Sequence, residues 1–207
     1  MNFIILASSI VAVILIAING RRQKKMNADQ EESFWDRERR ANSVRRKSLD
    51  NLNYITIPLE TFPTHILQQD SVVAECIEML ENLTSQKIVN FTGYSNTDLK
   101  LEYGTANINL LSEYDQNFTL LVRTLQKWAD VLLEAGYREE ACVLMEYAVN
   151  IGTDVSRSYD ELAEYYASLN DFDAIDRLKY KAGNLHSSNK SIILRHLEQQ
   201  KYQMPVE

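Results

Sequence analysis

LQKWADVLLEAGYREEA (residues 125–141) and, 34 residues further on, YDELAEYYASLNDFDA (residues 159–174) are the two stretches that decide the fold. In both, large apolar side chains and a small one recur at spacings of three and four, the period of one face of a helix. Each stretch then reaches a residue that tolerates a left-handed backbone, Gly136 or Asn170. Each unit is therefore predicted to be a helix, a tight turn and a second, antiparallel helix.

Small side chains at matching positions allow the two helices of a unit to approach closely, as Ala129, Ala141 and Ala148 do in the first copy. The pattern resembles the tetratricopeptide repeat (TPR), a helix–turn–helix unit of 34 residues. The resemblance covers about residues 122–186, and Thr153 stands where the terminal proline of that repeat usually falls. It implies stacked helix pairs whose first helices line a groove that binds partners. Generic antiparallel helices are the alternative.

Two repeats bury too little surface alone, so further helices are expected to complete a TPR-like domain over residues 70–207. Apolar spacing and caps predict these helices at residues 70–85, 107–134 and 188–200. The polar stretch 87–104 is predicted to be a long connection with a short strand. Residues 49–69 are broken by prolines and predict an extended strap that docks on the domain.

The first 20 residues carry no charge, and the apolar run within them is about 24 Å long as a helix. Arg21, Arg22, Lys24 and Lys25 follow at once, which favours an uncleaved transmembrane anchor with its N-terminus outside and the remaining chain cytoplasmic. A cleaved signal peptide and a buried core helix are the alternatives. The predicted fold class is therefore mostly α: an N-terminal transmembrane helix followed by a TPR-like antiparallel helical repeat domain.

The net charge of −7 divides unevenly along the chain. Residues 21–50 carry ten Lys/Arg and six Asp/Glu, a net of +4, whereas residues 51–207 carry twelve and twenty-three, a net of −11. An acidic folded part argues against a nucleic-acid partner. Residues 21–48 are predicted to be a basic juxtamembrane linker or helix. Its first cations either lie on the membrane surface or only set the topology.

The whole chain, including the run RRKSLDNLNYITIP (residues 45–58), is also similar to a group of small uncharacterised membrane-anchored proteins of clostridial bacteria. This second resemblance implies a location in the bacterial inner membrane. It implies no activity.

Residues suited to catalysis or metal binding are few and scattered. His65, His186 and His196 lack ligand partners at useful spacing, and the six glycines form no phosphate-binding loop. Cys76 and Cys142 lie in apolar helical patterns and are predicted to be core residues. The sequence therefore predicts no enzyme activity, no cofactor and no metal site.

The helical repeat instead predicts a site for a protein partner, which the sequence does not identify. The 34-residue register places these groove candidates on the two first helices: Arg123, Gln126, Asp130, Arg157, Asp160 and Glu164. Arg123 and Arg157 occupy equivalent positions and are expected to pair with a carboxylate of the partner. The expected function is a membrane-anchored cytoplasmic adaptor or scaffold. The alternative is a structural or accessory subunit of a larger membrane protein complex.

Overall fold

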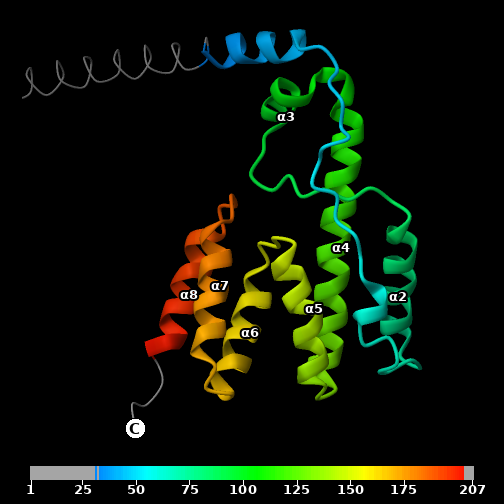
Figure 1. The fold of residues 1–207 in the computed structure, drawn as a ribbon, viewed down its shortest axis with the longest axis vertical. Helices are drawn as coiled ribbons and strands as arrows, with labels where there is room; N and C mark the ends of the chain where they lie inside the picture. The colour runs from blue at the N-terminus through cyan, green and yellow to red at the C-terminus, as the bar shows by residue number, and fades with distance from the viewer. Residues whose placement is uncertain (1–30, 32, 203–207) are drawn as a thin grey trace, which may run out of the picture. The chain divides into compact units, whose positions relative to one another are not determined.

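The computed structural model describes residue 31 and residues 33–202, which form helices and loops without a β-strand (Figure 1). After a helix over residues 33–43 come α2 (Ser71–Thr84), α3 (Asn96–Tyr103), α4 (Ile108–Glu134), α5 (Arg138–Asn150), α6 (Ser156–Ser168), α7 (Phe172–Gly183) and α8 (Lys190–Tyr202), with short 3-10 helices η1 (Leu59–Thr61) and η2 (Thr105–Asn107). The prediction of a mostly helical protein is confirmed.

These elements form two compact units. The first combines the described residues up to Lys47 with Ser95–Ile108, and the second combines Ser48–Tyr94 with the chain from Asn109 onward. In the second unit, α4 to α8 follow one another as antiparallel helices (Figure 1). The helices α2 and α4 begin one residue after their predicted starts at residues 70 and 107. Asp70 caps α2, because its carboxylate accepts hydrogen bonds from the backbone N–H groups of Val72 (2.8 Å) and Val73 (3.1 Å).

Three successive helices, α4, α5 and α6, end in the same way. Each is followed by a residue with positive φ: Gly136 (86°), Gly152 (84°) and Asn170 (57°). After α4, the N–H of Gly136 donates to Leu133 and that of Tyr137 donates to Leu132, the paired bonds of a Schellman motif. The same pairs recur after α5 and α6. The predicted left-handed turns at Gly136 and Asn170 are confirmed, and the third turn at Gly152 has the same physical cause.

The core of the second unit fills with the side chains that recur in the two repeated stretches. Trp128, Leu132 and Leu162 are fully buried, and Ala129 beside them is buried too. Full burial of a large apolar side chain stabilises a fold by about 1.5–3 kcal/mol. The predicted core cysteines are confirmed: both are buried free thiols. Burial raises the pKa of Cys142 to about 12.

Residues 49–69 cross the second unit without a strand. The N–H of Ile55 donates to the carbonyl of Ile88 (2.9 Å), and the hydroxyl of Tyr147 donates to the carbonyl of Thr56 (2.9 Å). The 3-10 helix η1 then turns Phe62 into the core, where its ring lies edge-on to the ring of Trp128 with centroids 6.2 Å apart.

The first unit contains a helix that the sequence analysis missed, because residues 87–104 were expected to form a connection with a short strand. Ser95 and Asp98 form a capping box that starts α3. Glu38, on the helix over residues 33–43, accepts hydrogen bonds from Thr97 and from Lys100 (3.0 Å), which lower the pKa of its carboxyl group. The Ser-x-x-Asp spacing was the available signal for this helix.

The predicted location in the inner membrane, with a cytoplasmic C-terminal domain, is contradicted. In the part of the chain that the structure describes, no helix is long and apolar enough to cross a bilayer. The physical reason is that even the longest of these helices, α4, carries charged residues such as Glu113, Arg123 and Lys127 along its exposed side. The predicted anchor (residues 1–20) and the cations Arg21, Arg22, Lys24 and Lys25 lie outside the described residues.

Tyr159, which is buried, and Tyr147, which is half-buried, predict a loss of stability at high pH. Burial raises the pKa of Tyr147 and of Tyr159 from 10.0 to about 12. Because the folded state holds these protons more tightly, their contribution is full below pH 10 and is lost as the pH rises toward about 12. For Tyr159 this loss lowers the free energy of unfolding of the wild type by about 2 kcal/mol between those pH values. We expect Tyr159→Phe to abolish this part of the pH dependence, measured by urea unfolding. Tyr180→Phe, at a side chain 76% exposed, is the control for the loss of a tyrosine hydroxyl and should leave the free energy of unfolding at neutral pH unchanged.

Candidate functional site

Three of the six predicted groove residues meet where α4 and α6 lie side by side. The guanidinium of Arg157 on α6 pairs with the carboxylate of Asp130 on α4 (3.2 Å) and, more loosely, with that of Glu161 (3.7 Å). Gln126 donates to Asp130 (2.7 Å) and accepts from the hydroxyl of Ser158 (2.6 Å). These contacts join α4 and α6, the helices that begin the two similar stretches of sequence.

The other three predicted residues have separate neighbours. Asp160 faces the ring of His196 on α8, with Nδ1 3.2 Å from both carboxylate oxygens. Glu164 pairs with Arg138 of α5 at 3.0 Å. Arg123 lies apart from both, at a small pocket of about 200 Å³ between α2 and α4. The structure therefore does not gather the six residues into one pocket.

One side of α6, together with the charged residues of α4 and α5 that pair with it, forms a surface with more carboxylates than arginines, which we call the α4–α6 face. Its carboxylates and arginines are Asp130, Asp160, Glu161, Glu164, Arg138 and Arg157. Both arginines are already paired within the chain. Arg157 would have to give up these contacts to meet a carboxylate of a partner.

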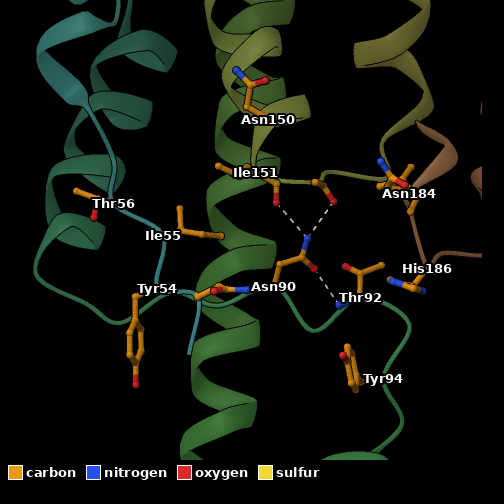
Figure 2. A pocket seen from close by; sticks show the side chains of 13 residues that line it. Tyr54, Ile55, Thr56, Asn90, Thr92, Tyr94, Asn150, Ile151, Asn184 and His186 are labelled. Atoms are coloured by element: carbon orange, nitrogen blue, oxygen red, sulfur yellow. Dashed lines mark hydrogen bonds between the residues drawn. The ribbon is translucent and has the colours of Figure 1, made fainter. Parts of the chain in front are cut away.

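A larger pocket, of about 540 Å³, lies elsewhere in the second unit. Four segments line it (Figure 2): the strap at residues 53–56, the loop that contains Asn90 and Tyr94, the end of α5 and the end of α7. Its lining residues are Asn53, Tyr54, Ile55, Thr56, Asn90, Thr92, Tyr94, Asn150, Ile151, Gly152, Asn184, Leu185 and His186. Four are asparagines, and none is Asp, Glu, Lys or Arg. We call it the asparagine pocket.

Asn90 holds two walls of the asparagine pocket together. Its side-chain N–H₂ group donates to the carbonyls of Ile151 (3.1 Å) and Gly152 (3.0 Å), and its side-chain oxygen accepts from the N–H of Thr92 (2.8 Å), as Figure 2 shows. The amide thus satisfies two carbonyls at the end of α5 that would otherwise lack a partner there. One fixed asparagine links the loop to the helix end.

Two glycines keep these walls in close contact. A Cβ atom on Gly93 would lie 2.5 Å from the carbonyl oxygen of His186, and one on Gly152 would lie 2.9 Å from the amide nitrogen of Asn90. Both glycines have positive φ. The close approach of the backbone therefore depends on the absence of a side chain at each position.

Sequence reasoning missed the asparagine pocket. Its asparagines stand at positions 53, 90, 150 and 184, too far apart in sequence to form a motif. The triplet Asn90-Phe91-Thr92 fits the N-glycosylation pattern. In the structure, however, the side-chain N–H₂ group of Asn90 donates to the two carbonyls of Ile151 and Gly152. The only local signal was Gly152, whose place after an apolar helix is typical of a helix end.

Metal ligands are not clustered in the part of the chain that the structure describes: no three His, Cys, Asp or Glu side chains there could hold an ion together. His196 faces Asp160, whereas His186 lies at the asparagine pocket and His65 is exposed. No protein-family model, curated protein or solved structure matches this chain.

Proposed function

We propose that this chain is a protein-interaction protein, an adaptor or scaffold built from TPR-like helical repeats, that binds a partner along the α4–α6 face. The observation that supports this proposal is the contact between α4 and α6 through Gln126, Asp130 and Arg157. These are the first helices of the two proposed repeats. Helix pairs stacked in this way present a continuous surface assembled from successive repeats, on which such proteins bind their partners.

The sign of the charges indicates the chemistry of the partner. Four carboxylates against two arginines give the α4–α6 face a negative potential, and complementary charge steers association and selects partners. We therefore expect the segment that contacts this face to be basic. Because exposed ion pairs contribute only about 0–1 kcal/mol each, charge reversal on this surface is expected to change binding far more than folding.

The test compares two charge reversals of equal size in the full chain. Asp160→Lys with Glu164→Lys reverses two carboxylates of the α4–α6 face, and Glu78→Lys with Glu81→Lys reverses two exposed carboxylates on α2. Recovery of a cross-linked partner from cells that make the protein should fall at least about tenfold for the first pair, since electrostatic attraction becomes repulsion. It should stay near the wild-type level for the second.

Melting curves followed by circular dichroism provide the control for folding in both double variants. Recovery of the partner at the wild-type level with both double variants, at unchanged melting temperature, would rule out the α4–α6 face as the binding surface. Loss with both pairs alike would mean that overall charge, rather than this face, governs the association.

A further inference from the structure

The asparagine pocket has hydrogen-bonding capacity that the protein does not use. The side chains of Asn53 and Asn184 make no hydrogen bond with other described residues, and both are exposed at the pocket. Asn150 accepts a bond from the ammonium of Lys181, which leaves its own N–H₂ group available. In contrast, Asn90 is fully engaged. The strap and the end of α7 thus each place at the pocket an asparagine without a partner among the described residues.

The uncharged lining narrows the chemistry of the ligand. An ionised ligand would lose part of its hydration on entering the pocket and would meet no opposite charge from Asp, Glu, Lys or Arg in the lining. Desolvation of an unpaired charge is unfavourable. A side-chain amide presents a donor and an acceptor together, which is the complement of a main-chain peptide group. Asn90 already makes such contacts with the backbone of its own chain, since it binds two carbonyls and one N–H.

The mixture of side chains also favours a polypeptide. Protein-binding surfaces such as antibody loops are rich in tyrosine, which supplies rigid contact area. They are also rich in asparagine, serine and glycine, which supply adaptable hydrogen bonding. Here Tyr94 is 49% exposed at the pocket, where Figure 2 shows its ring beside Thr92 and His186. The volume of about 540 Å³ lies in the range of pockets that hold drug-sized molecules, and an extended tripeptide spans about 10 Å.

Contacts within the chain hold the walls of the asparagine pocket in place. The bond from Ile55 to Ile88 fixes the strap, and Asn90 fixes the loop to the end of α5. Close packing of Gly93 against His186 fixes the end of α7. A preformed site loses little conformational freedom on binding, which favours the association of a short segment.

We propose that the asparagine pocket binds an uncharged, extended segment of a partner polypeptide through its main-chain amides, with Asn53 and Asn184 as the hydrogen-bonding residues. This inference rests on the proposed protein-interaction function and adds a second contact point to it. A basic region of the partner lies on the α4–α6 face, and an uncharged segment enters the pocket.

The test uses the full chain labelled with ¹⁵N and three small probes: N-acetyl-triglycine amide, maltotriose and spermidine. We expect the triglycine probe to shift the backbone N–H signals of Gly93 and Gly152 in a saturable way. Asn53→Leu with Asn184→Leu should weaken this binding about fivefold or more, because each lost hydrogen bond is worth close to that factor. The matched control, Asn82→Leu with Asn170→Gly, alters two exposed asparagines outside the pocket and should bind the probe as the wild type does.

Each other outcome overturns the assignment. No saturable shifts with triglycine would do so, as would tighter binding of maltotriose or of spermidine, which would assign the pocket to sugars or to cations. Equal affinity of the Asn53/Asn184 variant and the wild type would remove the named residues from the site. Since the partner recovery experiment changes only Asp160 and Glu164, a failure of the pocket leaves that result standing and is distinguished from a failure of the proposed function.

Discussion

Trp128→Ala is expected to lower the free energy of unfolding by about 3–5 kcal/mol, the largest effect of any single substitution considered for this protein. Trp128 is 0% exposed, and its ring packs edge-on against Phe62 of the strap. Removal of the indole leaves a cavity at the place where α4 meets the strap, so the loss combines transfer of the side chain to water with lost packing. Urea unfolding followed by circular dichroism at 222 nm measures the difference.

The other tryptophan of the chain supplies the matched control. Trp35 is 52% exposed on the helix over residues 33–43, and Trp35→Ala should change the free energy of unfolding by no more than about 0.5 kcal/mol. That variant also leaves Trp128 as the sole source of indole fluorescence, so its emission reports the core directly. A loss of similar size for both substitutions would contradict the core position of Trp128.

Trp128→Phe separates the two parts of this effect. The indole N–H of Trp128 is the one buried side-chain N–H or oxygen in the described residues without a hydrogen-bond partner. Phenylalanine keeps much of the apolar area and removes that unpartnered donor, whose burial is unfavourable. We therefore expect Trp128→Phe to be clearly less destabilising than Trp128→Ala.

Gly93→Ala should have the second-largest effect, because it combines backbone strain with a steric clash. Gly93 has a φ of 90°, and an added Cβ would lie 2.5 Å from the carbonyl oxygen and 2.6 Å from the Cβ of His186. The main chain at His186 would have to move, which opens the contact between two walls of the asparagine pocket. We expect a lower free energy of unfolding and, with it, weaker binding of the triglycine probe.

Gly136→Ala isolates the strain from the clash. Gly136 has nearly the same φ (86°), but nothing lies within 4 Å of its added Cβ. A non-glycine residue in this conformation costs about 1–2 kcal/mol, and crowding of a packed site adds about 1–3 kcal/mol. Gly93→Ala is thus expected to exceed Gly136→Ala by about 1–3 kcal/mol in urea unfolding. Equal losses of unfolding free energy for the two variants would show that the main chain at His186 shifts without an energetic penalty.

Helix positions and turn geometry were predictable because their signals are local. The spacing around Trp128 and Leu132 marks one buried face, and Gly136 and Asn170 mark the turns that follow. Asp70 caps α2 as its side-chain chemistry predicts. The helix α3 was missed although the capping box at Ser95 was visible, because a polar stretch of eight residues has too weak an apolar pattern to compete with the loop interpretation.

The contacts of the groove candidates could not be predicted from the sequence. The 34-residue register selected Arg157 as a cation for a partner, but it contains no information on the distance between Arg157 and Asp130. That distance, 3.2 Å, depends on how α4 and α6 pack. Asp160 and His196 are likewise 36 residues apart in sequence and adjacent in space.

The amino-acid sequence by itself determined most of the helices, the cap of α2 and the left-handed turns at Gly136 and Asn170, because each depends on residues within a few positions of one another. Only the tertiary structure decided which polar side chains meet. Asn90 reaches Gly152 across 62 positions, and the asparagine pocket exists only because the strap, a loop and the ends of α5 and α7 pack together. Contacts of that separation arise from the packing of the whole core, and no periodicity in the sequence records them.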